Sequence, residues 1–157
     1  FREISLNLYG VTMNEKLISV SKISDYKPAQ IFGVLSTPKL HKKIDGSGTI
    51  IAYLGSENLL KLNSKFKMLM HFKGIPYWIT NTVIMFENIK LIGWQHFGKN
   101  KWIYKLEEID DKTKITHIFD WSKSLSEKSV QFFIKQNKQN MRNSLNKLEE
   151  FLNRTYT

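Results

Sequence analysis

The sequence predicts one α+β domain in which a curved, seven-stranded antiparallel sheet is accompanied by two short helices and covered by a long C-terminal helix. Strand-like alternation recurs between residues 47 and 122, with turn residues between the runs, which indicates strands joined as hairpins. A stripe of apolar residues at helical spacing follows from 126 onward. A chain of 157 residues suits a single hydrophobic core.

The first part of the chain is predicted to contain one strand and two short helices. Residues 16–23 alternate from one side to the other with the period of a strand. A proline then opens an amphipathic pattern that predicts a helix over 28–35. Thr37 as N-cap, followed by Pro38, predicts a second short helix that stops before Gly46.

The central part of the chain is predicted to form six more strands. Turn residues separate them, as in Gly98-Lys99-Asn100 and Asp110-Asp111-Lys112. Connections this short favour antiparallel neighbours, because parallel strands need crossovers of about a dozen residues or more. The expected strands are 48–54, 64–72, 77–87, 90–97, 101–109 and 113–121.

The last part of the chain is predicted to form an amphipathic helix of about 27 residues, roughly 40 Å long. Ser126 provides an N-cap, and Glu127 suits the positive end of the helix dipole. The stripe lies at positions Val130, Ile134, Asn137, Met141, Leu145, Leu148 and Leu152, all of them apolar except Asn137. Phe133 and Phe151 widen it. A helix of this length can cross a whole sheet of this size.

Composition restricts the class of protein. The net charge of +10 invites a nucleic-acid or anionic-membrane partner, but lysines are scattered, outnumber arginines and form no strip with aromatic residues. We therefore expect a solvated surface, no nucleic-acid partner, and at most transient contact with an anionic membrane. No apolar run reaches the ~18 residues of a membrane-spanning helix, and the lack of cysteine removes disulfides and thiol chemistry. The sequence predicts a soluble, cytoplasmic protein.

The N-terminal segment 1–14 lacks the features of a secretory signal, and Met13 is a candidate start. We interpret 1–14 as an extension or a cloning remnant. The predicted domain is then 15–157.

Four segments carry a resemblance to a known superfamily: ISVSKISDYKPAQIFGVLSTPKLHKKIDGSGTI (18–50), FKMLMHFKGIPYWITNTVIMFE (66–87), IGWQHFGKNKWIYKLEEID (92–110) and TKITHIFDWS (113–122). In this order they resemble the START-like or SRPBCC superfamily, which includes polyketide cyclase/dehydrase proteins, lipid-transfer domains and the major birch-pollen allergen. The similarity is greatest to a bacterial branch of uncharacterised members and covers about 16–153. It implies a helix-grip fold with a deep cavity between sheet and long helix, used by different relatives for lipids, hormones or polyketide intermediates. It does not imply one reaction.

Strand parity indicates which side chains face that cavity. One parity of each strand points toward the helix, and the aromatic residues indicate which one. The strand 77–87 is apolar on both parities, so Trp78 is assigned inward without that guide. Core packing is the competing interpretation for every residue of the set. The candidate ligand-binding residues are Met68, Met70, Trp78, Trp94, His96, Trp102, Tyr104, His117, Phe119, Trp121, Phe133, Asn137 and Met141.

Among these, His96 and His117 are the candidates for acid/base chemistry, because histidine titrates near neutral pH. The alternative is a histidine held by hydrogen bonds within the core. Asn137 interrupts the apolar stripe of the helix and could offer its amide to a ligand or to a buried water molecule.

Motifs of several enzyme classes are missing from the sequence: HExxH, GxSxG, a P-loop and GxGxxG. Gly46-Ser47-Gly48 is interpreted as a bend into the next strand. The four histidines have no metal-ligand spacing, so we expect no metal and no cofactor. The leading hypothesis is a carrier or binding protein for a small hydrophobic molecule. The alternatives are a cyclase or dehydratase that uses His96 or His117, and a regulatory module that binds a protein partner; the sequence does not predict an oligomeric state.

Overall fold

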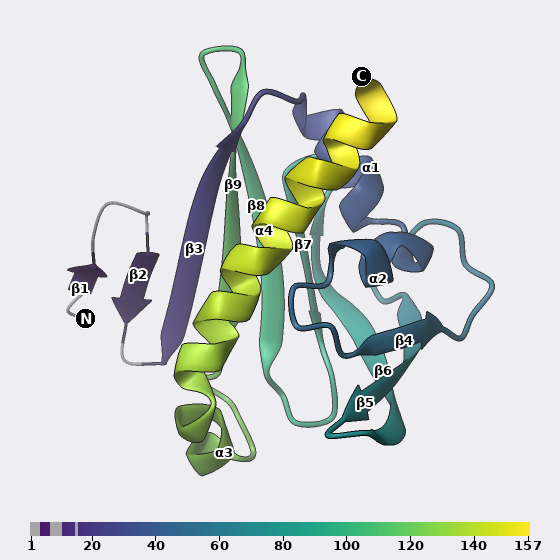
Figure 1. Ribbon diagram of the computed structural model, residues 1–157, viewed down its shortest axis with the longest axis vertical. Coiled ribbons are helices and arrows are strands. Elements are labelled where there is room, and N and C mark those ends of the chain that lie inside the picture. Colours follow the sequence, from purple (N-terminus) through teal and green to yellow (C-terminus); the bar gives the residue numbers. More distant parts are fainter. Residues whose placement is uncertain (1–3, 7–10, 15) are drawn as a thin grey trace.

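The computed structural model describes residues 4–6, 11–14 and 16–157 of the chain. Figure 1 shows the helix α4 lying across the concave side of a single sheet. The elements in chain order are β1 (Ile4–Leu6), β2 (Val11–Asn14), β3 (Leu17–Ser24), α1 (Pro28–Leu35), the 3-10 turn η1 (Pro38–Leu40), α2 (His41–Ile44), β4 (Ile50–Tyr53), β5 (Lys65–Phe72), β6 (Ile75–Glu87), β7 (Leu91–Gln95), β8 (Lys101–Ile109), β9 (Lys112–Asp120), α3 (Glu127–Phe132) and α4 (Ile134–Tyr156).

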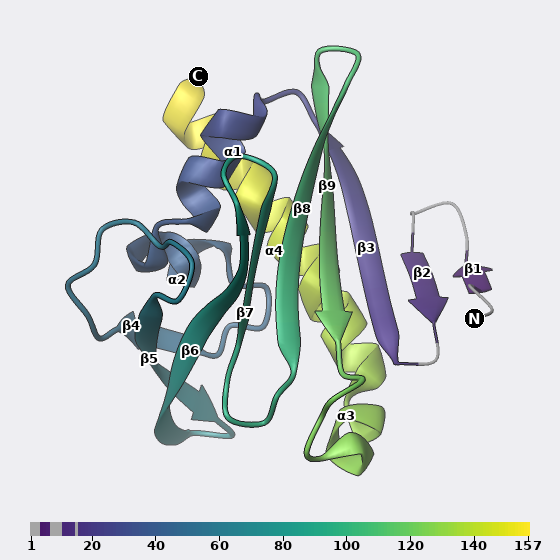
Figure 2. The same ribbon diagram turned by 180° about the vertical axis from the view of Figure 1, so that it is seen from behind.

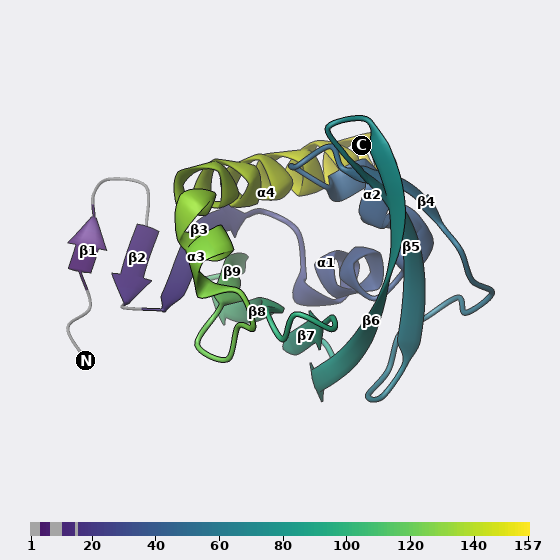
Figure 3. The same cartoon turned by 90° about the horizontal axis from the view of Figure 1, so that it is seen from below.

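The sheet is antiparallel throughout, with the strand order β1-β2-β3-β9-β8-β7-β6-β5-β4. From β4 to β9 each strand lies beside its neighbour in sequence, and β3 pairs with β9 along its whole length, from Leu17 opposite Asp120 to Ser24 opposite Thr113. Seen from behind, strands β6 to β9 lie in front of α4 (Figure 2), and from below the sheet bends around α1 and α4 (Figure 3). The predicted fold class, a curved antiparallel sheet with a long C-terminal helix, is confirmed.

Two short strands lie beside the seven that the sequence predicts. Residues of β2 pair with β3, with Thr12 opposite Ser19, and β1 pairs with β2. The segment 1–14, which we interpreted as an extension, therefore contributes strands to the edge of the sheet. Residues 1–3 and 7–10 of that segment, with residue 15, lie outside the described residues. Its interpretation as an added segment stays a prediction.

The predicted C-terminal helix is divided at Phe133, which separates α3 from α4. The amide of Phe133 is shared between the carbonyl oxygens of Ser129 and Val130, at 3.2 and 3.1 Å, so the backbone tightens there. The hydroxyl of Ser126 donates to the Ser129 hydroxyl and not to a backbone acceptor. A short helix thus precedes α4 at the end of the sheet where β9 finishes (Figure 1).

The two halves of α4 pack differently against the sheet. In the second half Leu145, Leu148 and Leu152 are buried in the core with β3 and α1 residues such as Ile18 and Ile31. In the first half the side chains that face the sheet are mainly amides and smaller groups: Gln136, Asn137, Asn140 and Ser144, with Met141 among them. Because short polar side chains do not fill the space that leucines fill, the concave side is hollow beside the first half of α4.

Candidate ligand-binding pocket

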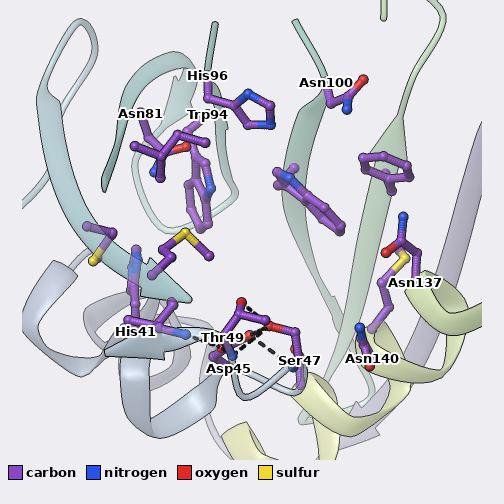
Figure 4. Close-up of a pocket in the computed structure, with 18 of the residues that line it drawn as sticks. His41, Asp45, Ser47, Thr49, Asn81, Trp94, His96, Asn100, Asn137 and Asn140 are labelled. Atoms are coloured by element: carbon purple, nitrogen blue, oxygen red, sulfur yellow. Dashed lines mark hydrogen bonds between the residues drawn. The ribbon is translucent and has the colours of Figure 1, made fainter. Parts of the chain in front are cut away.

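A pocket of about 600 Å³ lies between the concave face of the sheet and the first half of α4 (Figure 4). Strands β5 to β9 supply the largest part of the wall, and α3, α4 and the segment from α2 to β4 supply the rest. Volumes of this size are typical of sites for small molecules. The lining consists of His41, Ile44, Asp45, Ser47, Thr49, Ile50, Phe66, Met68, Met70, Phe72, Tyr77, Ile79, Asn81, Trp94, His96, Asn100, Trp102, Tyr104, His117, Phe119, Ser129, Val130, Phe133, Gln136, Asn137, Asn140, Met141 and Ser144.

Cross-strand pairs of rings form the wall on β8 and β9. Tyr104 lies opposite His117 and stacks on it, with centroids 3.9 Å apart and an interplanar angle of 5°. Trp102 lies opposite Phe119, with centroids 4.2 Å apart. Paired residues on neighbouring antiparallel strands point to the same face, so the sheet register itself aligns these rings toward the helix.

A second aromatic cluster joins the wall to α2. The ring of His41 stacks on Trp94 at 5.0 Å, and Phe66 meets Trp94 edge-on at 5.6 Å. The Nε2–H of His41 donates to the carbonyl of Leu35 at 2.8 Å, which fixes the ring against the end of α1. Trp94 is thus packed against a ring on each of two sides.

The loop from Asp45 to Ile50 forms the end of the pocket next to α2, which we call the loop end. The Asp45 carboxylate accepts four hydrogen bonds, from the Ser47 amide at 3.0 Å, the Ser47 hydroxyl at 2.6 Å, the Thr49 amide at 3.0 Å and the Ile50 amide at 3.1 Å. Gly46 donates its amide to the Ser144 hydroxyl at 2.8 Å, which ties the loop to α4. The carboxylate is therefore occupied in holding the loop.

The bend predicted at Gly46-Ser47-Gly48 is present, and its two glycines are needed for different reasons. Gly48 has a φ of +69°, which side chains rarely adopt. Gly46 lies against the backbone of α4, where an added Cβ would approach the Asn140 carbonyl oxygen to 2.1 Å.

We call the partly exposed side of the pocket the mouth and define it by Phe72, Tyr77, His96, Asn100 and Phe133. These residues come from the β5–β6 hairpin, the β7–β8 loop and the junction of α3 with α4. The hairpin part of the mouth borders the loop end, because the His71 amide donates to the Thr49 carbonyl at 2.9 Å, whereas its other part lies across the pocket. The rings of Phe72 and Phe133 meet edge-on at 5.9 Å, so the hairpin touches the helix junction. Figure 4 shows His96 and Asn100 in that other part, away from Asp45, Ser47 and Thr49.

Three asparagine side chains in the lining have no hydrogen-bond partner among the described residues: Asn81, Asn100 and Asn137. Asn81 is only 7% exposed, and the Oδ1 atom of Asn100 is buried. Buried amides normally find partners, so three unused amides around one pocket offer donors and acceptors to a guest. Asn140, by contrast, accepts from Gln136 at 2.9 Å.

Burial shifts the pKa values of three histidines and of Tyr104 in the wall toward the uncharged form of each group. It lowers the pKa of His117 to about 4 and that of His41 to about 4, although each ring donates to a backbone carbonyl. Burial also lowers the pKa of His96. Burial and the charge of Asp45 raise the pKa of Tyr104. Among the described residues that line the pocket there is no lysine, arginine or glutamate, despite the net charge of +10.

The tautomers of two histidines follow from their partners. His117 Nδ1 lies 3.0 Å from the carbonyl oxygen of Ile103, so Nδ1 carries the proton and Nε2 is an acceptor. His96 Nδ1 accepts from the Gly98 amide at 3.0 Å, so its Nε2 carries the proton and can donate. The pocket therefore offers one imidazole acceptor and one imidazole donor.

The structure brings most of the sequence-predicted site residues together. Eleven line the pocket: Met68, Met70, Trp94, His96, Trp102, Tyr104, His117, Phe119, Phe133, Asn137 and Met141. Their role in binding a ligand stays a prediction.

Two predicted site residues do not line the pocket. Trp78 is 65% exposed and lies opposite Leu69, on the other face from Met68 and Met70, where its ring contacts the Lys67 ammonium at 4.9 Å. The inward assignment of Trp78 is wrong. The residues of β6 that lie opposite the inward-facing Met68 and Met70 are Ile79 and Tyr77, so Trp78 points to the outer face. Trp121 is buried in the core just beyond the end of β9.

Sequence reasoning missed the unpartnered amides of Asn81 and Asn100 and the whole loop end. Asn81 carried a signal, since it is the polar member of the β6 parity that includes Tyr77 and Ile79. Asp45 precedes Ser47 and Thr49 at a spacing that permits its carboxylate to cap a turn. That spacing could have predicted the loop end.

The described residues also bear on a metal site and on a membrane-spanning helix. No group of three histidine, cysteine, aspartate or glutamate side chains gathers there in a way that could hold a metal ion. None of the helices in that part of the chain has the length and apolar character needed to cross a membrane.

Comparison with known proteins gives relatives in sequence and in structure. No protein-family model matches the chain. An uncharacterised protein of Mycobacterium tuberculosis H37Rv, Rv0088, is 31% identical over 94 residues, which are 59% of this chain and 42% of the relative. A second uncharacterised protein, MT0096 of strain CDC 1551, is 30% identical over the same share. The chain thus spans less than half the length of the curated relatives it matches.

Solved structures resemble this one over nearly the whole chain. Protein Ms6760 of Mycobacterium smegmatis superposes with a TM-score of 0.73 at 12% identity, over 93% of this chain and 98% of that one. An AHSA1-like protein of Aeromonas hydrophila gives 0.61 at 11% identity, over 87% and 93%. Ara h 8.0201 gives 0.61 at 16% identity, over 87% and 96%. With the geometry above, these likenesses show that the chain has the helix-grip fold.

Proposed function

We propose that the protein binds a small, uncharged and mainly apolar molecule in this pocket and acts as a carrier or binding protein. The observation that supports this most directly is the lining, in which aromatic and methionine side chains surround about 600 Å³. Among the described lining residues the one carboxylate, Asp45, accepts hydrogen bonds from the loop. Burying about 300 Å² of apolar ligand surface contributes roughly 7 kcal/mol before the cost of association is subtracted.

The charge of the lining supports a neutral ligand. A carboxylate or phosphate placed among these residues would lose its hydration and find no cation, because His41 and His117 stay neutral and the described lining has no lysine or arginine. The free-energy cost of removing a carbonyl, hydroxyl or amide group from water is much smaller. Such a group can also form hydrogen bonds with the free amides of Asn81, Asn100 and Asn137.

We also propose that the chain belongs to the START-like superfamily. The order of its elements, the curved sheet around α4 and the fold shared with Ms6760 and Ara h 8.0201 support this. The superfamily assignment does not choose the ligand, which depends on the side chains of this chain.

A matched series of ligands tests the proposal. Nile red, an uncharged fluorescent probe, should bind the purified protein and be displaced by dodecan-1-ol and dodecanamide at concentrations at least about tenfold lower than by dodecanoate. Native mass spectrometry of the freshly purified protein should then show a co-purified neutral molecule. Failure of the probe to bind, or equal displacement by dodecanoate, would contradict the proposed ligand class.

The unused amides are tested in the same assay. Asn81→Leu keeps a similar volume and removes the amide. It should therefore weaken the binding of dodecanamide by about 1 kcal/mol or more and leave the affinity for a ligand without polar groups unchanged. Asn58→Leu changes an exposed asparagine outside the pocket and is the matched control. Equal affinities of the two variants for dodecanamide would remove Asn81 from the site.

The enzyme hypothesis places His96 or His117 as acid or base. Both line the pocket, but a pKa of about 4 makes His117 a weak base near neutral pH, and its Nδ1 is occupied by Ile103. These observations favour binding over turnover. Loss of turnover in His96→Ala or His117→Ala with ligand binding intact would reverse that preference.

A further inference from the structure

Large apolar side chains stand exposed around the mouth of the pocket. Phe97 is 79% exposed, Leu125 67%, Phe132 82% and Ile75 69%, and Phe72 is half exposed. We call these five residues the rim. Exposed aromatic and aliphatic side chains that gather at one place mark a surface made to contact something apolar.

The segments that carry the rim touch one another. Phe72 of the β5–β6 hairpin meets Phe133 at 5.9 Å, and Phe133 meets Phe132 of α3 at 4.9 Å. The amide of Leu125 donates to the carbonyl of Gly98 in the β7–β8 loop at 3.0 Å, one residue after Phe97. Figures 1 and 3 show α3 and the β7–β8 loop at the same end of the molecule. The rim is therefore one surface assembled from three segments.

The same three segments are strongly basic. Residues 72–77, 96–101 and 121–138 contain seven lysines: Lys73, Lys99, Lys101, Lys123, Lys128, Lys135 and Lys138. They contain one acidic residue, Glu127, whose carboxylate is paired with Lys16 at 2.6 Å. No ion pair involving the seven lysines is present among the described residues. We include these seven lysines in the rim, whose positive charge is therefore not neutralised within the described part of the chain.

We propose that the rim docks on an anionic lipid bilayer, with the mouth of the pocket facing the membrane. Apolar side chains on separate loops can enter the boundary between headgroups and acyl chains, while lysines beside them meet anionic headgroups. An acidic protein partner is the less favoured occupant, because protein interfaces are depleted in lysine and enriched in arginine, and these segments contain no arginine. The orientation would let an apolar guest pass between bilayer and pocket without crossing water.

Vesicle sedimentation tests the apolar part of the rim. The protein should pellet with vesicles of phosphatidylcholine and phosphatidylglycerol mixed about seven to three, at least about tenfold more strongly than with phosphatidylcholine alone. The double variant Leu125→Ser, Phe132→Ser should lose at least about tenfold of that binding. The control is Leu59→Ser, Ile109→Ser, which changes exposed residues of the β4–β5 loop and the far end of β8 and should bind like the parent chain.

The charged part is tested with variants of equal net charge. Lys128→Gln, Lys135→Gln should bind the mixed vesicles several-fold more weakly than Lys39→Gln, Lys42→Gln, in which two exposed lysines outside the rim are neutralised. Binding should fall as salt rises. Equal vesicle binding by the two lysine variants, or by the two apolar variants, would overturn the proposal. If all four variants were retained on an acidic polypeptide column but none bound vesicles, the result would point to a protein partner instead.

Uptake of Nile red separates this proposal from the pocket function. The rim variants should take up the probe in the absence of vesicles as the parent chain does, because none of the substituted residues lines the pocket. Vesicle binding without probe uptake by the parent chain would leave the docking surface standing and remove the pocket function. Probe uptake without vesicle binding would do the reverse.

Discussion

The loop end and the mouth of the pocket differ in how their polar groups are used. At the loop end the Asp45 carboxylate accepts four hydrogen bonds, and the Ser144 hydroxyl accepts the amide of Gly46. At the mouth the Oδ1 atom of Asn100 is buried without a partner, and the Nε2–H of His96 is free to donate. At the loop end, therefore, the polar groups hold the fold together through hydrogen bonds. At the mouth, a polar donor and a polar acceptor have no partner within the described part of the chain.

This difference indicates where substitutions will act. A change at the loop end breaks contacts that already exist, so it should lower the free energy of unfolding. A change at the mouth removes groups that the folded chain alone does not use, so it should alter ligand binding with little effect on stability. The predictions below test that division, from the largest expected effect to the smallest.

Gly46→Ala should be the most destabilising. The added Cβ would lie 2.1 Å from the Asn140 carbonyl oxygen and 2.3 Å from the Ser144 amide nitrogen, both backbone atoms of α4 that cannot move aside easily. We expect the free energy of unfolding, measured with urea, to fall by about 3 kcal/mol.

The matched control is Gly33→Ala in the interior of α1, where an added Cβ meets nothing within 4 Å. It should raise the free energy of unfolding by up to about 1 kcal/mol, because alanine favours helix over glycine. A Gly46→Ala protein as stable as Gly33→Ala would mean that the loop does not pack on α4 as described.

The loop end also shows what the sequence could not predict. Gly46 and Ser144 are far apart in the chain, and their hydrogen bond depends on how α2 and α4 meet after folding. No local pattern encodes that contact. The strands were predictable because alternation and tight turns are local, and the rings of β8 and β9 followed because only one parity there is rich in aromatic residues.

The error at Trp78 has a local cause that the sequence did contain. Lys73 and Gly74 both have positive φ, at 49° and 81°, which makes a two-residue hairpin turn, so Phe72 pairs with Ile75. We expected a longer turn and a strand that starts at 77. The two-residue turn alone would have placed Tyr77 opposite Met70, and hence Trp78 on the outer face.

Acid should destabilise the protein through its buried histidines. Folding lowers the pKa of His117 from 6.5 to about 4, so between these values the unfolded chain binds a proton that the folded chain does not. Stability is therefore full above about pH 6.5 and falls as the pH drops toward 4. For His117 alone the loss is about 2 kcal/mol between pH 7 and pH 5.

Urea unfolding of His117→Asn and of His96→Asn at both pH values checks this. The loss between pH 7 and pH 5 should shrink markedly in His117→Asn, because one of the proton-linked groups is gone. Part of the loss should remain, because burial also lowers the pKa of His41 to about 4. The loss should shrink less in His96→Asn, because His96 at the mouth keeps part of its surface in water. An unchanged loss in His117→Asn would show that this histidine is not buried and neutral in the folded protein.

The smallest effect on stability is expected at the mouth, where Phe72 and Phe133 meet. Both rings are partly exposed, so Phe72→Ala and Phe133→Ala should each change the free energy of unfolding by about 1 kcal/mol or less. The contact lies between the pocket and solvent, so removing it should speed the release of Nile red several-fold in stopped-flow measurements. The double variant should release the probe no faster than the faster single variant, because either substitution alone opens the contact. Release rates that multiply in the double variant would mean that the two rings act separately and that the hairpin and the helix junction do not close the mouth together.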